Sequence, residues 1–415
     1  MTRRVVITGL GVVSPVGNDI DTFWSNIKQG NIGITKIDDR LNMEGLKTKV
    51  AAFVNDFDPL DYVSKMELKR YDMFSHYAIA ATKQAFDDAG LDVEQMNYTP
   101  ERIGTIIGSG IGGLHTWEDE FYRLYVEEKP KPKPLFIPMV LSNMAAGNVA
   151  IKFKAKGISE CPVTACASGN NAIGNGLRAI QYNHADMMIV GGTEASVTRI
   201  GLGAFEALTA LSKSEDPTRA SIPFDADRGG FVMGEGAGIL ILEELEHAKA
   251  RGAKIYAEVV GYGASNDAHH MTSPDPEGNG AKRSMQYAMV DANLTPEDID
   301  YINAHGTSTK ANDDHETIAI KKALGDTAYK VAISSTKSMT GHMLGAAGGV
   351  EGIISALALK DGFIPPTANL EKKDENLDLD YVAKVGREQE ITVAMSNAFG
   401  FGGHNATIIM KKYVD

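Results

Sequence analysis

Cys166 is the residue of this chain best suited to nucleophilic chemistry. It lies in the run Thr-Ala-Cys-Ala-Ser-Gly, where a short extended segment meets small residues at helical spacing. Such small side chains predict a buried helix that begins at the cysteine. Free backbone N–H groups and the dipole at a helix start stabilise a thiolate, which is the nucleophilic form of cysteine. A lone buried cysteine is also ordinary packing, so the assignment depends on its partners.

Two histidines could be those partners. His305 follows the apolar run Ile-Asp-Tyr-Ile-Asn-Ala and precedes Gly-Thr-Ser-Thr, so it is expected at the carboxyl end of a parallel strand, where α/β active sites collect. His342 lies between Gly341 and a run of small residues, five positions after Lys337. Each histidine alone is equally compatible with a hydrogen-bonded structural role. Together with Cys166 they predict one reactive site at strand-to-helix junctions.

Two other kinds of site fit the sequence poorly. Residues 108–113 match G-x-G-x-x-G after a predicted strand, but no acidic residue closes a strand about twenty residues later, as a dinucleotide site requires. These glycines, like Gly9 and Gly11, are expected to allow close backbone packing around a pocket. The sequence has no H-E-x-x-H motif or compact His/Cys spacing, so a metal-dependent mechanism is not expected.

Short Val/Ile-rich runs alternate with alanine-rich helical stretches, which is typical of an α/β protein with parallel strands. A segment with Lys-Pro repeats, 127–138, predicts an extended arm. The expected strands are 4–8, 103–107, 187–190, 238–242, 257–262, 299–303, 331–335, 392–395 and 406–410, and the expected helices are 68–89, 168–182, 279–292, 315–324 and 346–359.

The second half of the chain loosely repeats the first. In both 161–192 and 331–362 a strand leads through a polar turn to a helix of small residues and then to another strand. This similarity predicts two related halves packed on one another rather than two independent domains. We expect an N-terminal half, 1–255, that carries the cysteine and a C-terminal half, 256–415, that carries both histidines.

Composition limits the setting in which the chain works. Its 415 residues, 43% of them hydrophobic, can bury a large core. A formal net charge of −13 makes nucleic acid an unexpected partner. Two cysteines are too few for a disulfide framework, and the chain has no run of about 18 apolar residues, so we expect a cytoplasmic protein without membrane insertion.

The motifs together identify a family. Thr-Ala-Cys-Ala-Ser-Gly, Asn-Ala-His-Gly-Thr-Ser-Thr, Ser-Thr-Lys-Ser-Met-Thr-Gly-His and Asn-Ala-Phe-Gly-Phe-Gly-Gly closely resemble the β-ketoacyl-acyl carrier protein synthases of the thiolase superfamily. The order Cys, His, His is similar to the elongating, type II branch. The resemblance covers essentially the whole chain and implies a thiolase-like five-layered α-β-α-β-α fold, a homodimer and no organic cofactor.

The resemblance also implies an activity. It is a decarboxylative Claisen condensation, in which an acyl group on Cys166 is joined to malonyl-acyl carrier protein to give a 3-oxoacyl-acyl carrier protein two carbons longer. Phosphopantetheine arrives on the carrier protein. In the family, His305 and His342 stabilise the enolate, Lys337 orients the first histidine with support from Glu351, and the backbone N–H groups of Cys166 and Phe401 hold the second oxyanion.

Further residues are implied by matching family positions. Phe401, in Phe399-Gly400-Phe401-Gly402-Gly403, corresponds to the gate that admits malonyl only once the acyl chain is seated, and flanking glycines would let this loop reorient; Phe399 is an expected substrate-binding residue. Any cation at the positions matching the family's cation site is expected to be structural. The other matches are acyl-tunnel residues Ile111 and Leu202; Phe136 and Ile137 from the partner subunit; Thr307 and Thr309 beside the phosphopantetheine arm; a basic carrier-protein-docking helix with Lys65, Lys69 and Arg70; and a cation site of Asn303, Glu351, Ser396 and Asn397.

The chain departs from the family at three positions. Lys310 stands where the family often has Pro, His404 where many members have Thr, and Glu206 where some members are basic. The last leaves the second edge of the carrier-protein footprint open. Two alternatives remain: a ketosynthase of a polyketide pathway, and a non-catalytic chain-length partner, which would lack the nucleophile that this chain keeps.

Overall fold

The computed structural model describes residues 2–414 and places the strands of a 10-stranded sheet in two rows that meet edge to edge. In hydrogen-bonding order, the first row is β5 (Ser159–Glu160), β4 (Ile103–Gly108), β6 (Met187–Glu194), β7 (Gly236–Glu244) and β1 (Val5–Val13). The second row is β10 (Ala332–Ser334), β9 (Tyr301–Asn303), β13 (Val393–Gly400), β14 (His404–Lys411) and β8 (Ala257–Asn266). Only two residue pairs, between β1 and β8, join the rows.

The two rows repeat the same pattern of strand directions. In the first row, β5, β4 and β6 pair in parallel, and β7 and β1 follow antiparallel. In the second, β10, β9 and β13 pair in parallel, and β14 and β8 follow antiparallel. The expectation of two related halves is therefore confirmed, whereas the exact boundary between residues 255 and 256 stays a prediction.

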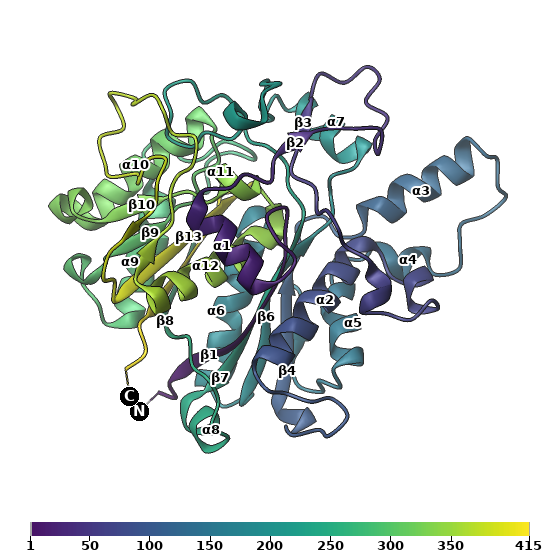
Figure 1. The fold of residues 1–415 in the computed structure, drawn as a ribbon, viewed down its shortest axis with the longest axis horizontal. Coiled ribbons are helices and arrows are strands. Elements are labelled where there is room, and N and C mark those ends of the chain that lie inside the picture. Colours follow the sequence, from purple (N-terminus) through teal and green to yellow (C-terminus); the bar gives the residue numbers. More distant parts are fainter. Residues whose placement is uncertain (1, 415) are drawn as a thin grey trace.

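Helices separate and cover these sheets, which gives five layers. The outer helices α2 (Met73–Asp88) and α5 (Met144–Lys152) pack on the first row, and α9 (Asn279–Ala292) and α10 (Lys310–Leu324) lie outside the second. Between the rows, α6 (Ser168–Gln181) and α12 (Ala347–Asp361) contact each other and strands of both halves. In Figure 1 this order runs from α9 and α10 on the left to α2 and α5 on the right. The expected α-β-α-β-α fold is confirmed.

The remaining helices and strands lie around this five-layered core. The first row carries α1 (Ile20–Gln29), α3 (Leu114–Tyr125), α4 (Phe136–Val140), α7 (Arg199–Ala207) and α8 (Leu245–Ala250), and the second carries α11 (Lys337–Thr340). Two small strand pairs are β2 (Thr35–Lys36) with β3 (Val50–Ala51), and β11 (Phe363–Ile364) with β12 (Arg387–Glu388).

Glycines allow the layers to approach closely, as expected. A Cβ added to Gly11 on β1 would lie 1.8 Å from the Ala81 carbonyl oxygen of α2. A Cβ on Gly108 would lie 2.5 Å from the backbone of Ser168 at the start of α6. The glycines that resemble dinucleotide fingerprints therefore serve backbone contact between sheet and helices.

The expected helix 68–89 is too long at its start. The helix α2 begins at Met73, because the Asp72 side chain accepts from the N–H of Phe74 and caps it. The segment before it contains only a 3-10 turn over Glu67–Lys69. Lys65, Lys69 and Arg70 are therefore on an exposed turn segment, and the prediction that they share a helix is wrong.

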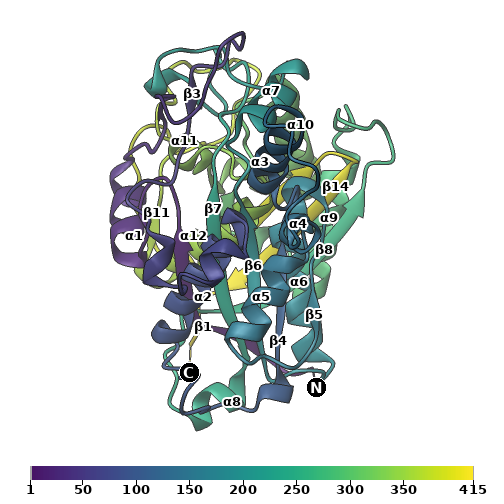
Figure 2. The same cartoon turned by 90° about the vertical axis from the view of Figure 1, so that its right-hand side faces the viewer.

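An arm projects from the first half and is built from α3, the Lys-Pro segment and α4 (Figures 1 and 2). The buried carboxylate of Glu120 on α3 accepts from Arg123 Nε at 3.0 Å and from Lys133 N at 2.9 Å. Trp117 packs edge-on against Phe136 at a ring distance of 4.7 Å. These contacts fold the arm back so that α4 lies beside α3.

Within residues 2–414, none of the helices combines the length and the apolar character that crossing a bilayer demands.

Candidate active site

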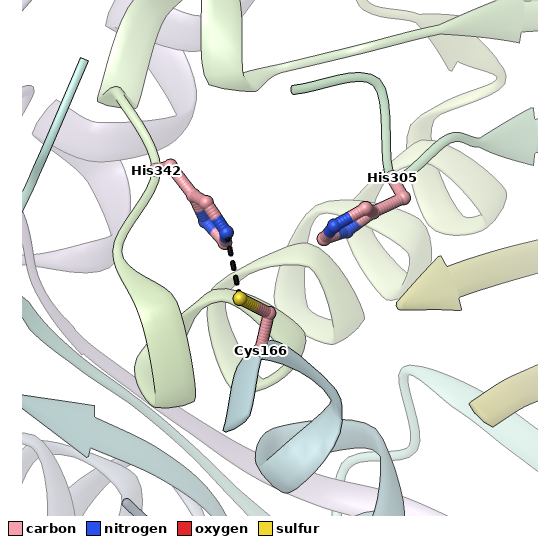
Figure 3. A group of neighbouring side chains, drawn as sticks. All are labelled: Cys166, His305 and His342. Carbon is pink, nitrogen blue, oxygen red and sulfur yellow. Dashed lines mark hydrogen bonds between the residues drawn. The ribbon is translucent and has the colours of Figure 1, made fainter. Parts of the chain in front are cut away.

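A cavity of about 740 Å³ opens between the two halves of the fold and contains the predicted reactive residues. It is lined by Cys166 from the first half and by His305 and His342 from the second. Figure 3 shows the three side chains pointing into one space, with the cysteine at a helix start and each histidine on a loop. One ligand atom from each lies within 4.8 Å of the others.

A tight turn presents Cys166 to this cavity. Residues Ala165–Ala167 form a 3-10 turn that runs into α6, and Ala165 has a φ of 51°, in the left-handed region that non-glycine residues rarely adopt. The Ser168 hydroxyl closes the turn, because it donates to the Ala165 carbonyl at 2.6 Å and accepts from the Thr164 N–H at 2.9 Å. This strained backbone conformation holds the thiol at the helix start.

His342 contacts the thiol directly. Its Nε2 lies 3.0 Å from Cys166 Sγ. On the other side of the ring, the N–H of Leu344 points at Nδ1 over 3.3 Å, so Nδ1 is the acceptor and the proton belongs on Nε2. This tautomer makes His342 a hydrogen-bond donor toward the sulfur.

His305 faces His342 nearly at right angles, with ring centroids 5.3 Å apart. The buried carboxylate of Glu316 fixes its backbone by accepting from the N–H groups of His305 and Gly306 at 2.8 and 2.7 Å. Phe399 packs against the His305 ring at 5.6 Å. His305 is therefore held by its backbone and by ring packing.

Both histidine rings are neutral at physiological pH. Burial lowers the pKa of each well below its ordinary value, and the positive charge of Lys337 lowers it further. A neutral imidazole can donate an N–H hydrogen bond without being a strong acid. The pair is thus suited to stabilising a developing anion.

Lys337 is 1% exposed and its ammonium is hydrogen-bonded to Glu351 Oε1. Burial raises the pKa of Glu351 to about 7, and Lys337 opposes that rise. The lysine acts on both histidines through its charge; its ammonium bonds the glutamate, whereas the structure has no His305–Lys337 hydrogen bond among the described residues.

The resting thiol of Cys166 is protonated. Burial raises its pKa to about 12, and the opposing effect of Lys337 is smaller. Desolvation therefore outweighs the stabilisation that the helix start gives to a thiolate. Charge on the sulfur must develop only as the nucleophile reacts.

Cys166, His305 and His342 are also spaced as three metal ligands would be. Coordination through His342 Nε2 would require its proton to move to Nδ1, toward the Leu344 N–H that already points there. The geometry therefore favours hydrogen-bond donation by His342 over metal binding.

Three buried oxygens at the expected cation positions have no hydrogen-bond partner among residues 2–414: Asn303 Oδ1, Glu351 Oε2 and Ser396 Oγ. Unpaired buried oxygens are costly, and carboxylate, amide and hydroxyl oxygens suit a hard cation. Asn397 differs, because its Oδ1 accepts from Thr407 Oγ1 at 2.9 Å. Three of the four expected cation ligands thus fit a cation, and the Asn397 side chain does not.

The cavity wall contains most of the residues expected around the substrate. Ile111, Thr307, Thr309, Phe399 and Phe401 all line it. The turn after Phe401 has two glycines at positive φ, Gly402 and Gly403.

The other expected tunnel residues lie away from the wall. Leu202 is buried behind it, in the apolar cluster that includes Ile111 and Cys166. Phe136 and Ile137 lie on α4 outside the cavity of this chain, and Ile137 is 56% exposed.

The expected docking residues Lys65, Lys69 and Arg70 are all exposed. Glu206, by contrast, is committed to the fold, because its carboxylate accepts from the N–H groups of Lys47 and Thr48 at 2.8 and 2.7 Å. The Glu206 carboxylate therefore stabilises the neighbouring loop that contains Lys47 and Thr48.

Family models cover both halves of the chain. The model described as "Beta-ketoacyl synthase, N-terminal domain" matches residues 2–248, and "Beta-ketoacyl synthase, C-terminal domain" matches residues 256–371. The chain belongs to the β-ketoacyl synthase family.

Individual relatives agree with this membership. The Synechocystis sp. protein named 3-oxoacyl-[acyl-carrier-protein] synthase 2 is 49% identical over 412 residues, which cover 99% of this chain and 98% of that protein. The solved ishigamide ketosynthase/chain length factor superposes with a TM-score of 0.94 at 35% identity, over 100% of both chains. The AntDE:AntF complex, a type II PKS acyl-carrier protein with its ketosynthase, matches with a TM-score of 0.90 at 36% identity, over 100% of both chains.

This β-ketoacyl synthase site includes residues that the motifs did not indicate. Phe231 packs edge-on against His342 at 5.3 Å, and Phe205 lies 6.3 Å from Phe401. Glu194 accepts hydrogen bonds from two segments beside the cavity. Only Glu194 left a signal in the sequence, as an acidic residue just after an apolar strand.

Proposed function

We propose that this protein extends fatty acyl chains by decarboxylative condensation of acyl-acyl carrier protein with malonyl-acyl carrier protein. The observation that supports this most directly is the position of Cys166 Sγ, which lies 3.0 Å from the N–H-bearing Nε2 of His342. Both side chains line a cavity that His305 also lines. The 49% identity to a 3-oxoacyl-[acyl-carrier-protein] synthase supports the substrate class.

In the first step the sulfur of Cys166 attacks the thioester carbonyl of the acyl carrier protein. A carbon–sulfur bond forms, the phosphopantetheine thiolate leaves, and it takes up the proton that the cysteine releases. The His342 N–H and the start of α6 stabilise the charge that develops on the sulfur. The product is an acyl-enzyme.

In the second step malonyl-acyl carrier protein loses its carboxylate as CO₂, and the electron pair of the broken bond forms an enolate. The N–H groups of His305 and His342 stabilise the enolate oxygen. The carbanion attacks the acyl-enzyme carbonyl, whose oxyanion is held by the backbone N–H groups of Cys166 and Phe401. Collapse breaks the bond between the acyl carbon and Cys166 Sγ and releases the 3-oxoacyl product, and the Cys166 thiolate takes up a proton from solvent.

The order of entry is the proposed role of the turn 401–403, which joins β13 to β14. Phe401 and Phe399 lie at the cavity wall, and the flanking glycines allow the loop to turn. Ile111 and Leu202 shape the acyl end, and the hydroxyls of Thr307 and Thr309, 2.9 Å apart, face the phosphopantetheine arm.

The carrier protein is the proposed partner, and the turn segment with Lys65, Lys69 and Arg70 its dock. Complementary charge mainly raises the association rate. Reversing the three charges to Glu should raise KM for acyl carrier protein substrates and leave acyl transfer from a short pantetheine thioester unchanged. An unchanged KM at low salt would place the dock elsewhere.

We also propose a cytoplasmic homodimer. The arm exposes Leu135, Ile137 and Leu141, an apolar row that a second copy could cover. In that arrangement Phe136 and Ile137 would close the partner's acyl tunnel. Sedimentation of the wild type against Ile137→Asp tests this, and a monomeric wild type would refute it.

No organic cofactor is required by these steps. A cation at Asn303 Oδ1, Glu351 Oε2 and Ser396 Oγ would supply charge neutralisation for Glu351 and keep the Lys337 surroundings rigid. We propose that its role is structural.

A polyketide ketosynthase is the second candidate, because the solved type II PKS ketosynthase complex superposes with a TM-score of 0.90 at 36% identity. The higher identity to the fatty acid enzyme, 49%, favours elongation. A non-catalytic chain-length partner is disfavoured by Cys166.

The test uses octanoyl-acyl carrier protein, then malonyl-acyl carrier protein, with intact mass of protein and product. We expect octanoyl transfer to the wild type but not to Cys166→Ala, and then a decanoyl-length 3-oxo product. A folded wild type that takes up no acyl group would overturn the proposal.

A further inference from the structure

Glu194 is a fully buried carboxylate at the end of β6 that the steps above do not use. Among residues 2–414 it forms no ion pair with a lysine or arginine. Its close partners are instead N–H and O–H donors, which satisfy its oxygens and oppose the rise in its pKa that burial causes.

One carboxylate group joins two segments. Oε1 accepts from Ser109 Oγ at 3.0 Å and from Ile111 N at 3.2 Å, whereas Oε2 accepts from Gly110 N at 2.8 Å and from Gly345 N at 3.0 Å. The first segment belongs to the N-terminal half and the second to the C-terminal half. Glu194 therefore bridges the halves beside the cavity.

The first segment lies at the cavity wall, and the second lies beside the backbone that orients the His342 ring. Ile111 lines the cavity and packs in the same apolar cluster as Cys166. Gly345 directly follows Leu344, whose N–H points at His342 Nδ1 and sets the tautomer of that ring. A displacement at Ile111 can thus reach His342 through one carboxylate and two peptide units.

We propose that Glu194 is a positioning residue that couples the acyl-pocket wall at Ile111 to the backbone that orients His342. On this inference, which rests on the proposed acylation of Cys166, an acyl chain against the wall tightens the loop behind the histidine. The enzyme then orients its enolate-binding N–H when the first substrate is seated.

Three variants distinguish the effects of side-chain length at position 194, of its negative charge, and of a general loss of fold stability. Glu194→Asp keeps the charge but is too short to hold both segments. Glu194→Gln keeps the length but removes the charge and presents an NH₂ group to backbone donors. Glu243→Gln is the matched control, because Glu243 is also fully buried but bonds Thr8 and Arg251 away from the cavity.

The coupling is measured by amide hydrogen exchange before and after octanoylation of Cys166. In the wild type and in Glu243→Gln, acylation should slow exchange in both 109–113 and 342–347. In Glu194→Asp the change should be confined to 109–113, and the condensation rate should fall about tenfold or more, a larger loss than that of acyl transfer, because the enolate depends on the N–H groups of both histidines.

Alkylation of Cys166 by iodoacetamide adds a readout that needs no carrier protein. The charges that act on the thiol are Lys337, which favours the thiolate, and Glu194 and Glu351, which oppose it. Glu194→Gln should therefore alkylate about three- to tenfold faster than the wild type at pH 7.

The outcomes are distinct. An acylated wild type without altered exchange at 342–347, or a Glu194→Asp variant that responds like the wild type, would overturn the coupling. A wild type that is alkylated at Cys166 but never acylated would overturn the proposed function, and this inference with it.

Discussion

Gly349 lies where the middle layer meets the first sheet, and we predict that Gly349→Ala damages both stability and activity. A Cβ at this position of α12 would lie 2.2 Å from the Gly238 carbonyl oxygen on β7 and 2.7 Å from the Gly192 nitrogen on β6. Both are backbone atoms of a central sheet, so neither can rotate away. Ordinary contact requires about 3.4 Å, so the helix must retreat by about 1 Å.

The expected magnitude follows from two opposing effects. Alanine improves helix propensity by about 1 kcal/mol, whereas overpacking against rigid backbone costs about 3 kcal/mol. The net loss of about 2 kcal/mol should lower Tm by several degrees. Because α12 begins just after His342, a displacement near 1 Å should also cost about 100-fold in condensation rate.

Gly352→Ala is the control on the same helix. There a Cβ would meet only side-chain tips, with Ile173 Cδ1 at 3.0 Å and Met410 Cε at 3.5 Å. Its propensity gain is equal, so its Tm should equal or exceed that of the wild type. Thermal unfolding and single-turnover condensation compare the two variants. Equal Tm and rate for both would refute the argument from close backbone approach.

Three further predictions concern charge. Lys337→Met leaves the Glu351 carboxyl buried without the lysine ammonium, so it should destabilise the fold by about 3–5 kcal/mol. The acid limb of its pH–rate profile should also move to higher pH, because the lysine charge no longer lowers the pKa of the two histidines. Arg102 and Arg3 hold the pKa of Asp186 well below its usual range, so its stabilisation is present above pH about 4 and is lost as pH falls below that value; the Tm difference between Asp186→Asn and wild type should be large at pH 7 and shrink in acid. Finally, NaCl, KCl or MgCl₂ should raise Tm above that in choline chloride of equal ionic strength, and Asn303→Ala should abolish this response; an equal Tm in all salts would argue against a cation there.

The fold and the reactive trio could be predicted because local patterns determine them. The helix 279–292 was bounded correctly, since a glycine precedes it and an asparagine in the left-handed region ends it. His305 and His342 follow the parallel strands β9 and β10, and Cys166 follows β5 of the other row, so each half could be predicted to present its residues at a strand end, and packing of the two halves brings them together. The two halves could be inferred from their repeated order of elements.

Other features depend on tertiary contacts that a linear pattern does not contain. The true start of α2 depends on the Asp72 side chain, which also accepts from the distant Thr116 N–H at 2.8 Å. The protonated state of Cys166 results from burial by residues far apart in the chain. Glu206 resembles a surface charge until its bonds to Lys47 and Thr48 are seen.

The repeated halves carry matching helix starts, and this explains why each chain has one catalytic centre. The turn before α6 begins with Ala165 at φ 51°, and the turn before α12 begins with Leu344 at φ 48°. The residue that follows is Cys166 in one half and Gly345 in the other. A side chain at Gly345 would meet the Gly110 nitrogen at 2.5 Å, and its own N–H is already bound to Glu194. If the halves descend from one duplicated ancestor, the position that matches the nucleophile in the second half now connects the two halves through Glu194. The first half then supplies the nucleophile, and the second half supplies the histidines that stabilise the anion.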